Sequence, residues 1–508
     1  MPSSSHPGRT LAACILASVL VFLDGSVVNV ALPAIRDDLG GTLAGQQWIV
    51  EGFLLSLSAL LLLGGSLGDL MGRHRVLIVG VLAFGATSLL CALAPSVELL
   101  VAGRILQGVA GALLVPVSLA IITATFAESE RGAAIGTWTA GTSVSMIAGP
   151  FVGGFFVDQV SWRLIFAINV PLVLATLWLA RSIVPDRPRS HVKIDGTGAL
   201  LATIGLAGVI YALVEQPAGG WGAARVAVPG VVGVVALAAF LAWERRVDEP
   251  MLPLGMFRSR DFAAINLATV ALYAPLGAST FVLSVFLQQV AGYSATHAGL
   301  ALLPTTLVVI VAARRFGGLA DRLGRKHFVG TGALVCAAAF ALLLRVDADA
   351  PYLAQILPAV LVLGVGLSIA VAPLTATVLA TVGEAHAGTA SGINNAASRV
   401  AGLVAIAALG GLAATTFTGR VDAATRTAPA ESRPALVAAR EQPFVLTNTA
   451  PVGEQRAVRA ELADASVAAY RTAMGAGAVL AALASLIAFA GLTSRHAAPA
   501  EPEPEPAI

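Results

Sequence analysis

The chain has 508 residues, of which 57% are hydrophobic and only 12% are charged, and its formal net charge is +2. A soluble domain carries about 25% charged residues, so this composition excludes an ordinary water-soluble enzyme and an intrinsically disordered chain. The small net charge gives no sign of a nucleic-acid-binding protein.

Apolar stretches of membrane-spanning length recur along the whole chain. A helix needs about 20 predominantly apolar residues to cross the hydrocarbon core of a bilayer. We therefore expect an all-α integral membrane protein with fourteen transmembrane helices near residues 11–34, 46–67, 76–95, 98–126, 132–157, 164–184, 197–215, 226–243, 263–290, 297–314, 328–345, 351–380, 388–414 and 471–492.

The first two stretches each contain an acidic residue. Asp24 lies late in the first stretch, which runs on past it without a convincing signal-peptide cleavage site and is expected to be retained. A charged carboxylate inside a bilayer is costly, so Asp24 should face a wet cavity or a partner, where it could gain and lose a proton. The alternative is an acid near the interface that merely caps or pairs. Glu51 is a second titratable group, a contact for a cationic substrate, or an acid at the outer interface.

A glycine-rich turn follows the second stretch and returns in the second half. Residues 65–75 read Gly-Ser-Leu-Gly-Asp-Leu-Met-Gly-Arg-His-Arg, and residues 317–327 read Gly-Gly-Leu-Ala-Asp-Arg-Leu-Gly-Arg-Lys-His. Repeated halves are typical of secondary transporters. They divide the chain into an N-terminal six-helix bundle, two additional helices and a C-terminal six-helix bundle, at 1–190, 191–247 and 248–508. Asp69 and Asp321 are expected at a helix start, where free N–H groups favour a carboxylate.

Arg104 lies deep in the fourth stretch, and Gln107 follows one turn later on roughly the same face. An isolated arginine in hydrocarbon is costly, so Arg104 should pair with an acid or bond to carbonyl groups. The fifth stretch carries small residues and a proline, which let helices approach closely and remove one backbone hydrogen bond. These residues are Gly141, Gly149, Pro150, Gly153 and Gly154.

Polar side chains inside the spans are candidates for a substrate cavity. Amides in a span can equally hold helices together, and Arg399 needs a partner in either role. The candidates are Asn29 and Gln107 in the first half, and Asn266, Tyr273, Gln288, Gln289, Asn394, Asn395 and Arg399 in the second.

The distribution of positive charge indicates how the chain lies in the membrane. More than half of its 31 Lys and Arg residues fall in connections on one side when the N-terminus is placed in the cytoplasm. The positive-inside rule therefore favours a multi-pass protein of the cell membrane with both termini cytoplasmic. Residues 415–470 are polar and are expected to form an extracytoplasmic loop. The tail 497–508 ends in Glu-Pro repeats and is expected to be disordered.

Five segments taken together resemble the major facilitator superfamily, and specifically its fourteen-span drug:H+ antiporter branch. The resemblance covers about residues 10–414 and the last span. The segments are 23–33, the turn 65–75 with its copy 317–327, 104–111, 149–154 and 162–171.

The resemblance implies a role for several of these residues. It implies that Asp24 and Arg104 take part in proton coupling, whereas Glu51 departs from the small polar residue that the branch often has. It implies that the two turns latch the cytoplasmic side of the outward-open state through Gly65, Asp69, Gly72 and Arg73, and through Asp321 and Arg325. It also implies that residues 141–154 form the flexible seam of an exporter.

These features predict a proton-coupled multidrug efflux antiporter that exports amphipathic cationic or neutral small molecules by alternating access. The alternative is a dedicated exporter of a lipid, a siderophore or an endogenous secondary metabolite, with residues 415–470 guiding an amphiphile. No phosphate loop, Ser-His-Asp spacing or metal-ligand cluster points to an enzyme. We expect a monomer driven by the proton gradient, without cofactor, metal or nucleic acid, whose partners are protons, small molecules and the lipid bilayer.

Overall fold

The structure is a computed structural model, and it describes residues 6–184, 195–247, 250–382, 387–440, 442–446 and 453–493. Every regular element in these ranges is a helix, as the sequence predicts. The predicted tail 497–508 and residues 185–194, which flank the predicted boundary at 190, lie outside the described residues. Several helices begin at a side chain that accepts a hydrogen bond from the backbone N–H three residues on, which stabilises a helix start. These caps are Thr42, Ser96, Asp195, Ser259 and Ser294.

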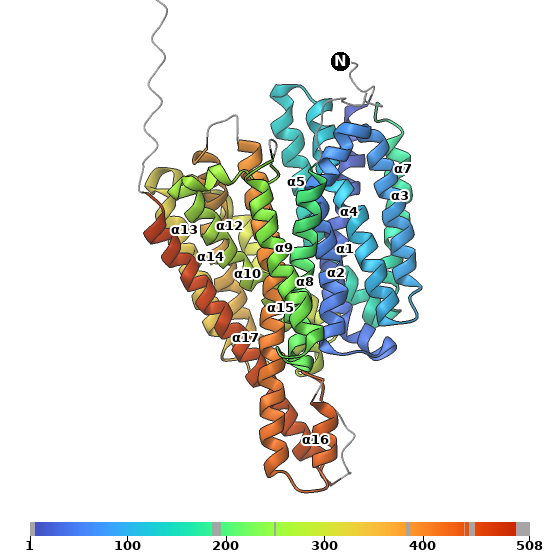
Figure 1. Cartoon of the computed structure of the whole chain (residues 1–508), viewed down its shortest axis with the longest axis vertical. Coiled ribbons are helices and arrows are strands. Elements are labelled where there is room, and N and C mark those ends of the chain that lie inside the picture. The colour runs from blue at the N-terminus through green and yellow to red at the C-terminus, as the bar shows by residue number, and fades with distance from the viewer. Residues whose placement is uncertain are drawn as a thin grey trace, which may run out of the picture.

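Two helical bundles lie side by side (Figure 1). The first bundle packs around buried apolar side chains such as Phe84, Leu114 and Ile122. Its helices are α1 (Pro7–Leu39), α2 (Leu43–Met71), α3 (Arg73–Ala92), α4 (Val97–Thr125), α5 (Glu128–Gln159), α6 (Leu164–Ala167) and α7 (Asn169–Ala180).

The second bundle packs around buried aromatic side chains that include Phe281, Phe340 and Phe417. Its helices are η1 (Leu254–Arg258), α10 (Arg260–Gln289), α11 (Ala295–Ala301), α12 (Leu303–Leu323), α13 (Arg325–Leu343), η2 (Tyr352–Ile356), α14 (Leu357–Ala380), α15 (Ala387–Thr427), α16 (Arg433–Ala439) and α17 (Gln455–Gly491).

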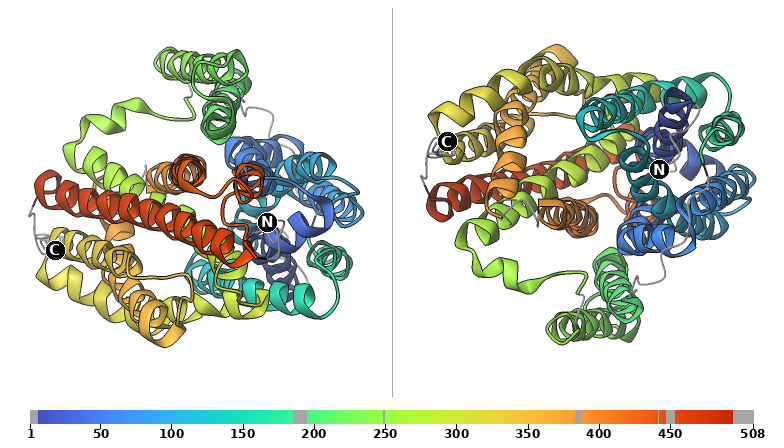
Figure 2. Two further views of the ribbon diagram at one scale, coloured as in Figure 1. Left: turned by 90° about the horizontal axis from the view of Figure 1, so that it is seen from below. Right: turned by 90° about the horizontal axis from the view of Figure 1, so that it is seen from above.

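Two further helices connect the bundles in sequence, α8 (Gly196–Gly219) and α9 (Ala224–Glu244). They pack against each other at the edge of the molecule, as both views of Figure 2 show. Helix α8 contacts α2 of the first bundle and α15 of the second. Its buried residues Ile210 and Val214 share a small apolar cluster with Leu55 and Leu403 from these two helices.

Eleven helices in the described parts of the chain are long and apolar enough to cross a membrane. The segment 164–180 is a shorter apolar helix, and α2 and α5 are long helices of the first bundle that are not among the eleven. The chain is therefore an all-helical protein with many apolar helices, and the count of fourteen spans stays a prediction.

The molecule has two opposite ends (Figure 1). The N face is the end at which α1 begins, and α17 also ends at this face. The α16 face is the opposite end, at which α16 lies. The described chain therefore begins and ends at the same face.

The repeated turns lie at the N face between α2 and α3 and between α12 and α13. The expectation of a helix start for Asp69 and Asp321 is wrong, because α2 continues to Met71 and α12 continues to Leu323. Both aspartates therefore fall in the last turn of the preceding helix. The chain breaks only at the second glycine of each copy, where Gly72 has φ +93° and Gly324 has φ +100°. This left-handed backbone is open to glycine at little cost, so the glycines and not the aspartates set the turns.

Residues 415–470 are folded in their described parts. Helix α15 has 41 residues and α17 has 37, which correspond to lengths of about 60 Å and about 55 Å. The hydrocarbon core of a bilayer is only about 30 Å thick. Both helices therefore project beyond the bundles and form, with α16, a helical extension at the α16 face (Figure 1). Arg440 and Asp422 form an ion pair across this α16 extension, at 2.9 Å between Nε and Oδ1.

Several hydrogen bonds join the two bundles in the half of the molecule toward the α16 face. Ser284 Oγ of α10 donates to the Asn29 carbonyl of α1 at 3.0 Å. Asp158 at the end of α5 accepts the backbone N–H groups of Ala295 and Thr296, which open α11, at 3.0 and 2.9 Å. Gln47 Nε2 of α2 donates to the Ile406 carbonyl of α15 at 2.9 Å. The molecule is therefore closed at the α16 face.

Candidate functional site

A buried polar cluster joins four helices of the first bundle. Arg104 of α4 forms an ion pair with Asp24 Oδ2 of α1, and both side chains are at most 1% exposed. Gln107 Nε2 and Asn169 Nδ2 both donate to Asp24 Oδ1, at 2.8 and 3.0 Å. The same two amide groups donate to Ser88 Oγ of α3, at 2.9 and 3.1 Å. Both carboxylate oxygens of Asp24 therefore have partners.

Arg104 is held on several sides at once. Its Nε donates to the Ile49 carbonyl of α2 at 3.0 Å, and its Nη1 donates to Gln107 Oε1 at 2.7 Å. The guanidinium carbon lies 4.2 Å from the ring centroid of Phe53 and 5.7 Å from that of Phe166. Ion pair, carbonyl and aromatic faces together compensate a charge that would be costly to bury alone.

Close packing of α2 on α4 brings the Ile49 carbonyl within reach of Arg104. A Cβ on Gly108 would lie 2.1 Å from Ser56 Oγ and 2.3 Å from the Phe53 carbonyl oxygen, so only glycine fits there. Ser56 Oγ also donates across this contact to the Ile105 carbonyl at 2.8 Å. The small residues of the fourth stretch thus serve the helix approach that the sequence suggested.

Glu51 is fully buried, and the structure does not bring it into the Asp24 cluster. Neither of its carboxylate oxygens has a hydrogen-bond partner among the described residues. One turn before it, Gln47 contacts α15, and one turn after it, Leu55 packs against α8 and α15. Glu51 therefore lies at the seam where α2 meets these two helices, on the closed side of the molecule.

The glycine and proline residues of α5 form close contacts between helices near the bundle seam. A Cβ on Gly149 would lie 1.9 Å from Ser26 Oγ of α1, and one on Gly153 would lie 2.4 Å from Val27 Cγ2. A Cβ on Gly154 would lie 2.4 Å from the Thr296 Cα of α11, in the other bundle.

Two further residues extend this face of α5. The Pro150 carbonyl oxygen would be 2.4 Å from a Cβ on Gly299 of α11, and a Cβ on Gly141 would lie 2.8 Å from Ile15 Cγ2 of α1. The predicted seam thus contacts α1 on one side and the second bundle on the other.

The arginines of the two repeated turns make equivalent bonds. Arg73 Nη1 donates to the Ala120 carbonyl near the end of α4 at 3.0 Å, and Arg325 Nη1 donates to the Ala376 carbonyl near the end of α14 at 3.2 Å. A Cβ on Gly65 would make only an ordinary contact, 3.5 Å from Pro116. Each of these arginine bonds stays within its own bundle, and the latch stays a prediction.

The polar candidates of the second bundle separate into two kinds. Asn394 Nδ2 of α15 donates to Asn266 Oδ1 and Thr269 Oγ1 of α10, at 3.1 and 2.7 Å, so these side chains join two helices. Gln288 Nε2 donates to the Ser284 carbonyl of its own helix at 3.3 Å.

The remaining candidates lie in different surroundings. Asn29 contributes its carbonyl group to the contact with α10. Tyr273 packs at the edge of the apolar core, Asn395 is exposed, and Gln289 has no hydrogen-bond partner for its amide among the described residues. Their contact with a substrate stays a prediction.

Arg399 of α15 faces the first bundle. Its guanidinium carbon lies 5.8 Å from the ring centroid of Phe22 of α1, and it forms no hydrogen bond or ion pair with another described residue. Phe22 in turn meets the edge of Trp138 of α5, with ring centroids 6.4 Å apart. The partner that the sequence required for Arg399 is therefore an aromatic face and not an acid.

Two members of the buried cluster were missed by the sequence reasoning. Asn169 is a polar residue in an apolar stretch and stands inside the recognised segment 162–171, so its position carried a usable signal. Ser88 gave none, because a serine in a span satisfies itself through its own helix as readily as it joins a cluster.

Comparisons with known proteins agree with this architecture. The pattern of the Major Facilitator Superfamily matches residues 14–406. The chain is 36% identical to a puromycin resistance protein of Streptomyces alboniger over 408 residues, 78% of this chain and 80% of the relative. It is 35% identical to a tetracenomycin C resistance and export protein of Streptomyces glaucescens over 418 residues, 81% of this chain and 78% of the relative.

A solved structure shows the same fold at low sequence identity. A bacterial homologue of the human lysosomal transporter Spinster, in an inward-facing and unoccupied conformation, superposes with a TM-score of 0.67 at 18% identity over 96% of this chain and 97% of the other. The sequence pattern covers most of the chain, and both curated relatives match over more than two thirds of it. The chain therefore belongs to the Major Facilitator Superfamily and is a multi-pass membrane transporter, not an enzyme.

Proposed function

We propose that this transporter is a proton-coupled exporter of amphipathic cationic or neutral small molecules, with its N face in the cytoplasm. The positive residues that border the spans support this orientation. With the N face inside, closure at the α16 face makes the described conformation inward-facing, ready to take up a molecule from the cytoplasm.

The observation that carries the proposal is the buried ion pair of Asp24 and Arg104. An exchange of protons for substrate requires a group that is neutral in one part of the cycle and charged in another. Protonation of Asp24 would remove the charge that Arg104 faces and one of the acceptor sites that Arg104, Gln107 and Asn169 share. Because these donors come from different helices, a proton on Asp24 would loosen the packing of α1 against α4 and α7.

The glycine face of α5 connects that event to the second bundle. Gly149 and Gly153 lie against Ser26 and Val27 of α1, within one helical turn of Asp24, while Gly154 and Pro150 lie against α11. A shift of α1 is therefore passed directly to the contact that closes the α16 face. Alternating access by rocking of two bundles follows from this arrangement.

Glu51 is a second group that we assign to proton handling. An ionised carboxylate without a partner is costly to bury, so the closed α16 face favours its neutral form. The helices that pack against α2 here carry the titratable side chains Tyr211 and Glu215 of α8, which contact Trp48, and Arg399 of α15, and none of them bonds to Glu51. Separation of α2 from α8 and α15 would admit water to Glu51 and allow it to ionise.

Glu51→Gln tests this assignment, because the amide has the same size and cannot ionise. In wild type we expect labelling of a Ser284→Cys reporter by a membrane-impermeant maleimide to increase as the pH rises, since ionised Glu51 favours the open α16 face. Glu51→Gln should weaken that pH dependence and keep its melting temperature. Glu461→Gln, at an exposed acid of α17, is the control and should behave as wild type. An unchanged pH dependence in Glu51→Gln would remove Glu51 from proton handling.

The range of substrates separates two forms of the proposal. Both curated relatives carry the names of single antibiotics, and one is named for resistance and export together. These names favour the dedicated exporter of an endogenous secondary metabolite. For an exporter of a lipid or a siderophore, the α16 extension would supply a surface that guides the amphiphile. The multidrug form is supported by the aromatic side chains Phe22 and Trp138 near the seam, whose rings pack edge to face and offer an apolar surface to molecules of many shapes.

A drug-susceptibility panel in a pump-deficient host tests the proposal as a whole. A multidrug exporter should raise resistance to several unrelated amphipathic dyes and antibiotics, and Arg104→Ala should abolish the effect. Resistance to a single compound class would select the dedicated exporter. No change for any compound, in cells that carry the protein in the membrane, would contradict both.

A further inference from the structure

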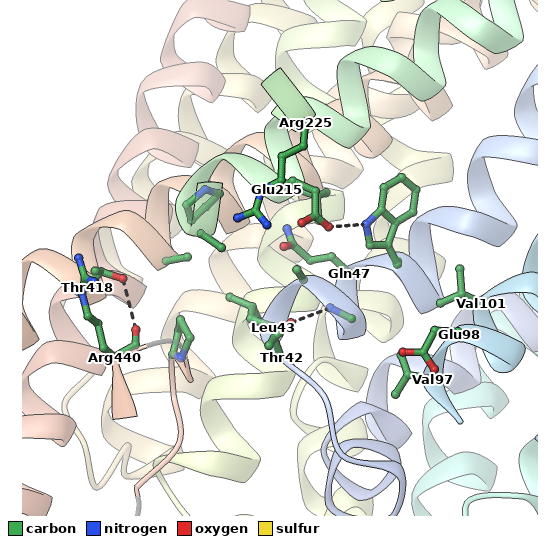
Figure 3. Close-up of a pocket in the computed structure, with 18 residues that line it drawn as sticks. Thr42, Leu43, Gln47, Val97, Glu98, Val101, Glu215, Arg225, Thr418 and Arg440 are labelled. Carbon is green, nitrogen blue, oxygen red and sulfur yellow. Dashed lines mark hydrogen bonds between the residues drawn. The ribbon is translucent and has the colours of Figure 1, made fainter. Parts of the chain in front are cut away.

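A cavity of about 750 Å³ opens at the α16 face, apart from the Asp24 cluster (Figure 3). This volume falls within the range of about 300–1,000 Å³ that drug-sized ligands occupy. Its walls come from three parts of the molecule, namely α2 and α4 of the first bundle, the α8–α9 pair, and the α16 extension. Thr418 and Arg440 supply the wall of the extension and lie opposite Val97 and Val101 (Figure 3).

The cavity lies directly outside the contact that closes the molecule. Gln47 lines it, and the same side chain donates to the Ile406 carbonyl of α15. A Cβ on Gly410 of α15 would lie 2.1 Å from Gln47 Nε2, so the two helices meet here without a gap. A molecule that passes between α2 and α15 when they separate would enter this cavity first.

The charges in the cavity are unequally compensated. Glu215 is half-buried, and its hydrogen bond to a described residue is a long one, from Trp48 Nε1 at 3.3 Å. Glu98 lines the opposite wall, and neither carboxylate forms an ion pair with a described residue. Arg440 is already paired with Asp422. Arg225 points toward the region of Glu215 (Figure 3), where it can donate to a neutral oxygen of a ligand.

We propose that this cavity is a release site that holds the exported molecule after it has passed α2 and α15, and that it selects an amphipathic organic cation. The positive group would lie against the Glu215 carboxylate and beside the Trp48 ring, where charge and the aromatic face both attract it. The apolar body would lie on Leu43, Val97 and Val101. The proposal rests on the outward direction of transport proposed above, and it gives the α16 extension a function as one wall of the exit.

Protection from labelling tests the site in the full chain. The three cysteines, all buried, are replaced and Val101→Cys is added as the reporter. Ethidium, an aromatic cation, should slow the reaction of this reporter with a small maleimide. Glu215→Gln should raise the ethidium concentration needed for half protection by about tenfold, as expected when one charge-assisted contact is lost. Glu98→Gln should have a smaller effect, because Glu98 is exposed, and Glu461→Gln should have none.

Each outcome decides the proposal separately from the function on which it rests. Protection that is lost in Glu215→Gln, together with slower ethidium export, supports a release site. Normal ethidium export without any protection of Val101→Cys overturns the site and leaves the exporter intact. Equal protection by the anion carboxyfluorescein overturns the selection for cations. Protection without export of ethidium by wild type overturns the assignment to release and counts against the proposed function.

Discussion

Asp24→Asn should abolish export driven by a pH gradient. The amide keeps the shape of the carboxylate and can still accept from Arg104, but it cannot take up or release a proton. We expect the rate of gradient-driven export to fall by at least about tenfold. The melting temperature should fall as well, because removal of one partner from a buried ion pair costs about 3–5 kcal/mol. Export is measured in liposomes that contain the purified protein, and stability by thermal unfolding in detergent.

Two further variants separate coupling from folding. The double variant Asp24→Asn with Arg104→Gln removes both buried charges, so it should recover much of the stability and none of the coupling. Asp37→Asn lies on the same helix at a side chain that is 65% exposed. Its ion pair with Arg36 is a surface pair worth about 0–1 kcal/mol, so this control should export as wild type does. Gradient-driven export by Asp24→Asn at the wild-type rate would show that the proton does not pass through Asp24.

Gly154→Ala should open the α16 face. The new Cβ would lie 2.4 Å from Thr296 Cα and 2.6 Å from Thr296 N, which are backbone atoms and cannot move without displacing α11. Overpacking of this kind costs about 1–3 kcal/mol. Here it destabilises the closed conformation alone. We expect maleimide labelling of the Ser284→Cys reporter to increase by about tenfold. Export should slow, because the transporter can no longer close the α16 face and return to the inward-facing state.

Gly136→Ala is a matched control for this variant. Gly136 lies on the same helix, and a Cβ there would have no neighbour within 4 Å. Alanine favours a helix over glycine by about 1 kcal/mol, so this control should be as stable as wild type or more stable. If Gly154→Ala labels and exports as Gly136→Ala does, the contact of α5 with α11 does not close the molecule.

The sequence was most informative about contacts at positions where burial of that type of residue costs free energy. Asp24 and Arg104 lie 80 positions apart, yet each was identified as a charge that needs a partner, and the structure pairs them. Close approach was likewise readable from small residues, since the face from Gly149 to Gly154 packs against two other helices. These inferences hold because a charge inside a bilayer needs a partner, and because small residues allow two membrane helices to approach closely.

Local signals were weaker where a neighbouring residue decides the geometry. Asp69 suggested a helix start, but the left-handed backbone falls at Gly72, three residues later. The polar composition of residues 415–470 suggested a loop, whereas two long helices extend through much of it. A polar helix outside the membrane needs only its neighbours for stability, and hydropathy alone does not reveal them. Nor could composition show that Asn394 and Asn266 bond to each other and Arg399 to an aromatic ring.

The most direct test of proton coupling uses wild-type protein in liposomes with the membrane potential clamped by potassium and valinomycin. Ethidium transport out of the N-face side is followed with a pH gradient, acidic on the α16 side, and again after an ionophore has collapsed the gradient. The account predicts fast transport with the gradient, transport near background without it, and substrate-dependent movement of protons in the opposite direction. Equal transport under both conditions would contradict it.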